Sequence, residues 1–180
     1  MITFIIFVFI VILILVSIRP SEVIARWHHH FDNLQLSSQD CYTSLQQHIE
    51  KRQIPGAKCY LVTFSEYGGV LSAQRLYFHV RNVTYRFHIC AAPYGTGFFV
   101  SWWLRESKSL GEILVNKWFP ITAQKTYYQL DTQTMFRESV HRAVLNMIED
   151  LTAGKGVRGL SELDQQTITN PKFNFQVKVE

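Results

Sequence analysis

The sequence predicts an α+β protein in which a single N-terminal transmembrane helix precedes an antiparallel sheet of about five strands packed against two main helices. Three observations support this fold class. Residues 2–18 are almost entirely apolar. Further along, apolar side chains recur every three or four positions in two segments and at every second position in several others. The alternating segments follow one another through short connections, which favours antiparallel pairing.

The apolar segment 2–18 contains no charged residue and ends at Arg19-Pro20. As a helix it would span roughly 25 Å, at the short end of a bilayer crossing. A cleaved signal peptide is the alternative, but it would require a positive charge before the apolar run and small residues at the cleavage site. No such charge is present, and Glu22 interrupts the best small-residue match. We therefore expect a retained membrane anchor that contacts lipid.

The charges beside this segment predict its orientation. Arg19 and Arg26 follow the apolar run and no positive residue precedes it. The positive-inside rule then places the N-terminus outside and the C-terminal domain in the cytoplasm. Cys41, Cys59 and Cys90 are odd in number and widely spaced, which indicates free thiols in a reducing compartment.

We divide the chain after the anchor into three parts. Residues 19–36 are expected to form a juxtamembrane linker, with Trp27 and the three following histidines at the membrane interface. Residues 37–160 are expected to form the α+β domain. Residues 161–180 are expected to form a C-terminal tail that ends in a strand.

Two amphipathic helices are predicted, one from Ser37 or Ser38 to about residue 53 and one over 132–153. Gly154 is suited to end the second helix. A short helix is predicted over 107–119. The predicted strands are 58–65, 73–81, 83–90, 98–104, 125–130 and 173–179.

The hairpin formed by 73–81 and 83–90 suggests a ligand site. One face of it is apolar, and the other is basic and aromatic. The candidate ligand-binding residues are Arg75, Tyr77, His79, Arg81, Arg86 and His88. Such a face can bind an anion, a lipid headgroup or a single-stranded nucleic acid. A solvated outer face is the alternative interpretation.

Two further segments suggest a partner interface. The strand at 98–104 is apolar on both faces, so Phe99 and Trp103 require a cover. That cover is either a helix of the same domain, or a partner or the membrane interface. In the tail, Phe173, Phe175, Val177 and Val179 share one face. We expect this strand to pair with a sheet edge of its own subunit or of a neighbouring one.

No catalytic motif can be identified, and we expect no enzymatic activity, no metal and no cofactor. The net charge of +4 is too small to suggest a nucleic-acid partner. The sequence favours a non-enzymatic interaction or scaffold subunit that docks or recruits a protein partner, or a second copy, at the cytoplasmic membrane face. The alternative is a membrane-tethered binding module for an anionic ligand, namely a lipid headgroup, nucleotide or nucleic acid.

Overall fold

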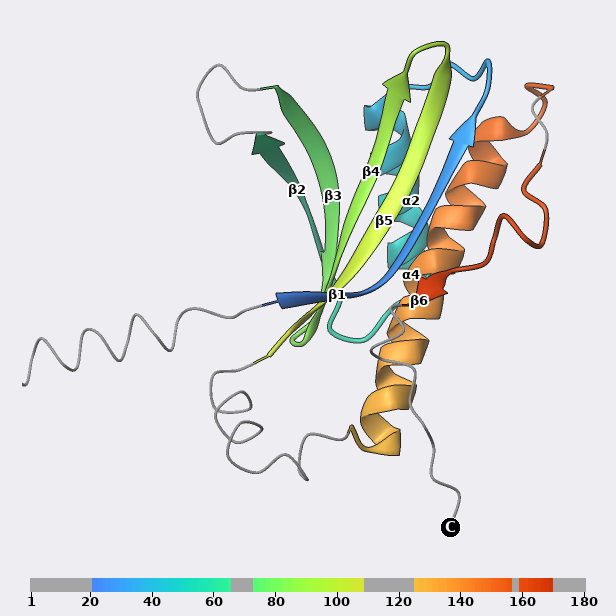
Figure 1. The fold of residues 1–180 in the computed structure, drawn as a ribbon. Coiled ribbons are helices and arrows are strands. Elements are labelled where there is room, and N and C mark those ends of the chain that lie inside the picture. The colour runs from blue at the N-terminus through green and yellow to red at the C-terminus, as the bar shows by residue number, and fades with distance from the viewer. Residues whose placement is uncertain (1–20, 66–72, 109–124, 157–158, 170–180) are drawn as a thin grey trace, which may run out of the picture.

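A computed structural model describes residues 21–65, 73–108, 125–156 and 159–169. These residues form an α+β domain with a six-stranded antiparallel sheet and two helices (Figure 1). The strand order is β2-β3-β4-β5-β1-β6. The predicted α+β class is confirmed, and the sheet has six strands instead of about five.

The first strand, β1 (Ser21–Phe31), occupies most of the segment predicted to be a linker. It pairs along its length with β5, with a bulge between Val23 and Ala25. Trp27, expected at the membrane interface, is instead 2% exposed and lies in the core. The linker prediction for this segment is therefore wrong, because alternate residues of β1 are needed to complete the helix-facing side of the sheet.

The next four strands form a continuous antiparallel meander. They are β2 (Lys58–Ser65), β3 (Gln74–Arg81), β4 (Tyr85–Tyr94) and β5 (Gly97–Ser107). Each corresponds to a predicted strand, with ends shifted by up to four residues. Asn82 orders the turn between β3 and β4, where its side-chain oxygen accepts hydrogen bonds from the backbone N–H groups of Thr84 and Tyr85.

The two helices lie on the same side of the sheet (Figure 1). Helix α2 (Ser38–Lys51) begins after Ser37, whose hydroxyl accepts a hydrogen bond from the backbone N–H of Asp40. Helix α4 (Tyr127–Thr152) is followed by Gly154, which adopts a φ of 72° that favours glycine. Both predicted helices are confirmed, and α4 begins five residues earlier than predicted.

The predicted strand at 125–130 is wrong. Thr126 caps α4 instead: its hydroxyl accepts from the backbone N–H of Gln129, and the Gln129 side chain accepts from the backbone N–H of Thr126. This reciprocal pair is a capping box, which satisfies two amides at the start of the helix. The first helical turn is therefore specified locally, despite its two strand-favouring tyrosines.

The tail returns to the sheet before its predicted strand. The indole Nε1 of Trp27 donates to the carbonyl of Asp164 at 2.6 Å, and β6 (Ile168–Thr169) pairs with β1. The predicted elements at 2–18, 107–119 and 173–179 lie wholly or almost wholly outside the described residues. Within the described ranges, no helix has both the length and the apolarity needed to cross a membrane.

Candidate functional site

The sheet has a helix-facing side and a second side that neither described helix covers, which we call the open face. Phe78 stacks on Tyr42 of α2, and Phe87 packs against Phe136 of α4. These contacts define the helix-facing side. Because successive side chains of a strand point to opposite sides, the alternate residues lie on the open face.

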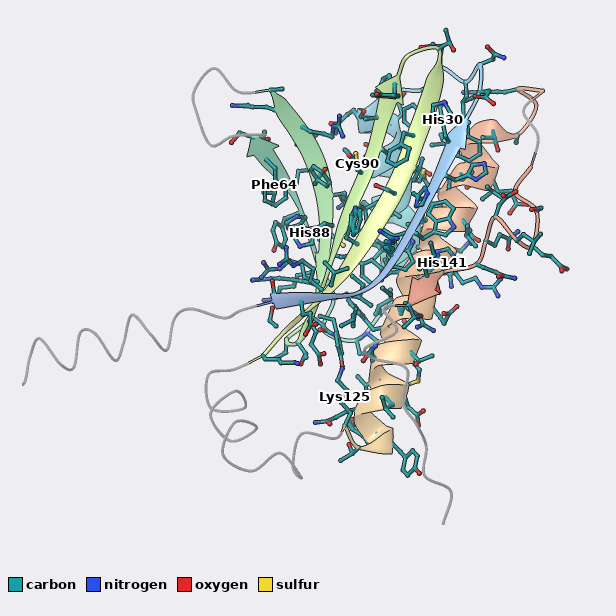
Figure 2. All side chains as sticks on the ribbon, viewed as in Figure 1. His30, Phe64, His88, Cys90, Lys125 and His141 are labelled. Carbon is teal, nitrogen blue, oxygen red and sulfur yellow. The ribbon has the colours of Figure 1, made fainter. Side chains whose placement is uncertain are left out.

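The open face carries cationic, aromatic and imidazole side chains on five adjoining strands. From β2 to β1 they include Lys58, Tyr60, Phe64, Arg75, Tyr77, His79, Arg81, Arg86, His88, Phe99, Trp103, Arg105, Arg26, His28 and His30. Figure 2 shows Phe64 and His88 on this face, on the far side of the sheet from His141.

One line of cross-strand neighbours on this face is entirely cationic, and we call it the basic row. Lys58 lies opposite Arg81, Arg81 opposite Arg86, and Arg86 opposite Arg105. Neighbouring strands are about 4.8 Å apart, and like charges directly opposite each other are destabilising. A bound anion would remove this repulsion.

Two carboxylates in the strands beside the basic row, those of Glu106 and Glu22, lie on the helix-facing side. Glu106 accepts a hydrogen bond from Lys125 at 2.7 Å, and Glu22 lies 3.7 Å from Lys108. None of the described strand residues that point onto the open face carries a carboxylate. The basic row therefore lacks a neutralising strand neighbour on its own face.

Beside the basic row lies a cluster of imidazole and aromatic rings. The ring centroids of His79 and His88 are 4.2 Å apart, and that of Phe64 is 5.5 Å and 5.7 Å from them. His79 is 3% exposed. Neither of its ring nitrogens has a hydrogen-bond partner in the described part of the chain. The cluster thus contains a buried, unsatisfied imidazole.

Burial lowers the pKa of both imidazoles from 6.5 to about 4. The positive charge of Arg86 adds to the lowering at His79. At His88 the further causes are His79, Arg105 and Arg86. Both rings are therefore neutral near pH 7, and their pKa values reflect the basic row beside them.

The two predicted interface residues of β5 lie on the same open face. Trp103 is 39% exposed, and the guanidinium of Arg26 lies 5.6 Å from its ring centroid. Phe99 is half-buried beside His28. Neither α2 nor α4 covers them. Of the two covers predicted for Phe99 and Trp103, a helix of the same domain is therefore not seen over this face in the described part of the chain.

The structure therefore merges two predicted sites. All the candidate ligand residues and both interface residues of β5 share one surface: Arg75, Tyr77, His79, Arg81, Arg86, His88, Phe99 and Trp103. The remaining interface candidates, Phe173, Phe175, Val177 and Val179, lie outside the described residues.

Seven contributors to this surface were not among the predicted site residues: Lys58, Tyr60, Phe64, Arg105, Arg26, His28 and His30. Lys58 and Phe64 could have been found, because the alternation of 58–65 places them on one face. Arg105 lies just beyond the predicted end of its strand. Arg26 was missed because β1 was interpreted as a linker.

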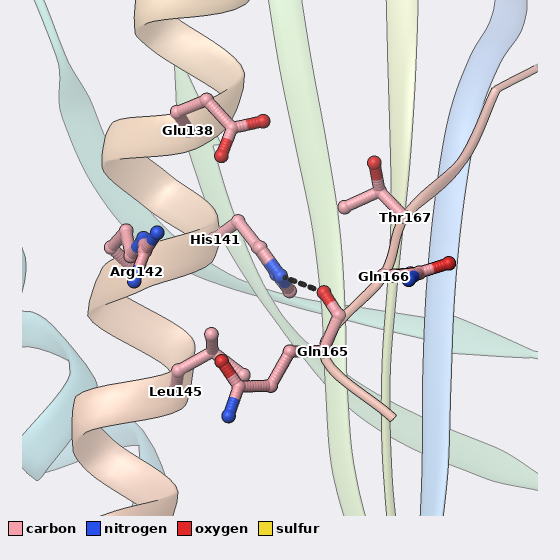
Figure 3. Close-up of a pocket in the computed structure, with 7 residues that line it drawn as sticks. All are labelled: Glu138, His141, Arg142, Leu145, Gln165, Gln166 and Thr167. Atoms are coloured by element: carbon pink, nitrogen blue, oxygen red, sulfur yellow. Dashed lines mark hydrogen bonds between the residues drawn. The ribbon is translucent and has the colours of Figure 1, made fainter. Parts of the chain in front are cut away.

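A second polar cluster surrounds His141, in a pocket of about 320 Å³ between α4 and the residues before β6 (Figure 3). Nδ1 of His141 accepts from the indole Nε1 of Trp102 at 3.0 Å, which leaves Nε2 to donate to the carbonyl of Gln165 at 2.8 Å. Both ring nitrogens are thus engaged in holding the fold. Burial lowers the pKa of His141.

The thiols do not provide an activated nucleophile. Burial raises the pKa of Cys41 to about 12 and that of Cys59 to about 11, and it also raises the pKa of Cys90. Since the thiolate is the reactive form, these protonated thiols are poor nucleophiles near pH 7.

Metal-binding geometry is not found either: within the described ranges, no three His, Cys, Asp or Glu side chains are grouped to hold an ion. Compared with protein-family models, curated proteins and solved structures, the chain matches none at a significant level. The functional argument therefore rests on the geometry and charge of the open face.

Proposed function

We propose that the chain is a membrane-tethered, non-enzymatic binding module that recruits an acidic protein partner through the open face of its sheet. The supporting observation is that the charged strand side chains described on this face are all cationic, lie among aromatic rings, and are covered by neither α2 nor α4. A negatively charged surface would meet a complementary potential here. The excess of positive charge also makes self-association through this face unfavourable.

The composition of the open face favours a protein over a purely ionic ligand. Arginine and tryptophan are enriched at the energetic centres of protein interfaces. Trp103 and Arg26 provide this pair, stacked within 5.6 Å of each other and both exposed. Phe64, 42% exposed, adds apolar surface on the other side of the imidazole cluster. The partner segment should therefore carry carboxylates together with at least one large apolar side chain.

The apolar segment 2–18 supplies the tether in this proposal. A module held at the membrane raises the local concentration of whatever it binds, without any further contact. The flanking arginines favour a cytoplasmic domain, so the proposed partner is cytoplasmic or a neighbouring membrane protein with a cytoplasmic segment.

The proposal is tested with the full chain in neutral detergent and a labelled peptide that combines glutamates with a tryptophan. Binding is measured by fluorescence anisotropy. We expect the double variant Arg26→Gln/Trp103→Ala to weaken binding by at least tenfold, since truncation of a central interface residue often costs about 2 kcal/mol. Affinity should also fall as salt is added, because exposed charges are screened.

The matched control is Arg142→Gln/Tyr128→Ala, which removes an exposed cation and an exposed aromatic ring from α4. It should bind the peptide as the wild type does. Equal binding by the wild type and the Arg26/Trp103 variant would show that the open face does not recruit acidic segments. A lysine-containing peptide of the same length should not bind.

A further inference from the structure

The basic row has a position of its own on the open face: it lies at the end of the sheet where β1 begins. Arg105, the last member of this row, lies opposite Val23 of β1, which is two residues after Ser21. Residues 2–18 precede Ser21 closely, and the three peptide steps from Ile18 to Ser21 span at most about 11 Å. If residues 2–18 cross the membrane, this row is the part of the open face nearest the lipid headgroups.

A pocket of about 310 Å³ adjoins the row at the same end of the sheet. Arg81 and Arg86 line it together with two serines and a threonine, Ser21, Ser107 and Thr84. Its floor is ordered before any ligand arrives, because Asn82 holds the β3–β4 turn and Ser107 N–H donates to the Thr84 carbonyl at 2.9 Å. Guanidinium groups beside hydroxyls are a donor set suited to phosphate.

The arginines of the row keep unused donors. Nη2 of Arg105 donates to the carbonyl of Ser21 at 2.8 Å, which holds the start of β1 against the row. The Nε atoms of Arg86 and Arg105 are buried and make no hydrogen bond within the described residues. No described ion pair involves Arg81, Arg86 or Arg105. Buried donors beside uncompensated charges indicate a site for an oxyanion.

We propose that the basic row and its pocket bind the phosphate of an anionic lipid headgroup in the membrane that holds the tether. This site is distinct from the Trp103 and Arg26 surface proposed for the protein partner. Lipid binding would fix the sheet with its Ser21 end toward the bilayer and leave the rest of the open face turned toward the cytoplasm.

The test uses the full chain in neutral detergent micelles and measures its Tm with phosphatidate, with phosphatidylcholine, or with inorganic phosphate at equal phosphate concentration. We expect phosphatidate to raise the Tm by about 5 °C or more, since a ligand that binds only the folded state stabilises it. Phosphatidylcholine should not raise it. The variant Arg81→Gln/Arg86→Gln should lose the rise, and Lys51→Gln/Lys155→Gln, with the same loss of charge, should keep it.

The variant also reports on folding. Without lipid, Arg81→Gln/Arg86→Gln should melt at or above the wild-type temperature, because it relieves repulsion in the row. An equal rise with inorganic phosphate would identify a free phosphate as the ligand and overturn the lipid assignment. If neither phosphatidate nor inorganic phosphate raised the Tm, the proposed phosphate site would be wrong. It would also be wrong if phosphatidate raised the Tm of Arg81→Gln/Arg86→Gln as much as that of Lys51→Gln/Lys155→Gln. Loss of acidic-peptide binding in Arg81→Gln/Arg86→Gln would assign the row to the protein partner.

Discussion

The hydroxyl of Tyr42 accepts a hydrogen bond from the backbone N–H of Ala91 at 3.0 Å and donates to the carbonyl of Leu76 at 2.8 Å. Leu76 and Ala91 lie where the β3–β4 pairing has ended, since its last partners are Phe78 and Ile89. The Tyr42 side chain, from α2, thus replaces a missing backbone hydrogen bond between β3 and β4 at the point where the two strands separate. Burial accordingly raises the pKa of Tyr42.

The first prediction concerns this bridge. Tyr42→Phe should lower the free energy of unfolding by about 1–3 kcal/mol, because it leaves a buried donor and a partly buried acceptor without a partner. Urea denaturation measures the change. Tyr128→Phe, at an 81% exposed position of α4, is the matched control and should have no measurable effect. If both variants were as stable as the wild type, the bridge would not contribute to stability.

The second prediction concerns Trp102 and His141. Replacing His141 by Leu leaves the indole N–H of Trp102 and the carbonyl of Gln165 unpaired and should cost about 1–3 kcal/mol. Trp102→Phe alone should also destabilise the domain. In the double variant the losses should not add, because both substitutions remove the same hydrogen bond. Additive losses in urea unfolding would contradict this coupling.

The third prediction concerns pH. The pKa values of His79 and His88 are lower in the folded state, about 4, than the value of 6.5 expected for the unfolded chain. Between these values the unfolded chain binds more protons. The contribution of the neutral imidazoles is therefore complete above pH 6.5 and is lost as the pH falls toward 4. The free energy of unfolding, measured in urea across this range, should decrease with falling pH.

The variant His79→Phe separates the contribution of the imidazoles to the pH dependence of unfolding from the contribution of the carboxylates, which also titrate in this range. His79→Phe should decrease the pH dependence of unfolding between 6.5 and 4, because it removes one of the two coupled imidazoles. It should cost little stability near pH 7, since neither ring nitrogen of His79 has a described hydrogen-bond partner. An unchanged pH dependence would show that His79 titrates normally in the folded protein.

These results indicate which parts of the fold could be predicted from the sequence. The four meander strands and both helices have clean periodicity, so their existence could be predicted. The strand β1 could not, because the bulge at Ile24 places two consecutive buried residues in it and breaks the alternation. The start of α4 was missed because aromatic residues suggested a strand, although Thr126 and Gln129 form a recognisable capping box.

The candidate site was predictable within one hairpin but not across the sheet. Alternation alone places Arg81 and Arg86 on one face, and the short turn makes them neighbours. Strand order could not be read from the sequence, so nothing indicated that Arg105 would extend the basic row. The same limit separated Trp103 from the hairpin residues, although it lies directly opposite His88.

The fourth prediction concerns the C-terminal strand. β6 pairs antiparallel with β1, with Ile168 opposite Arg26 and Thr169 opposite Ala25. β6 therefore runs toward the Ser21 end of β1. The segment 173–179 alternates apolar and polar residues, and exposing its apolar face would cost roughly 1.5–3 kcal/mol for each large side chain. We expect it to pair with a sheet edge of its own subunit, because that pairing requires no second molecule.

This pairing is tested by comparing the full chain with a chain truncated after Asn170, both solubilised in detergent. Unfolding and oligomer size are measured for each. We expect the free energy of unfolding to fall and the molecular mass to change only by that of the missing residues, because the strand pairs within its own subunit. Phe173→Ser/Phe175→Ser should reproduce the destabilisation at full length, and Asn174→Ser/Gln176→Ser should not. A smaller oligomer with an equally stable domain would instead show exchange between subunits through β-augmentation. If neither quantity changed, the segment would not pair with a sheet edge at all.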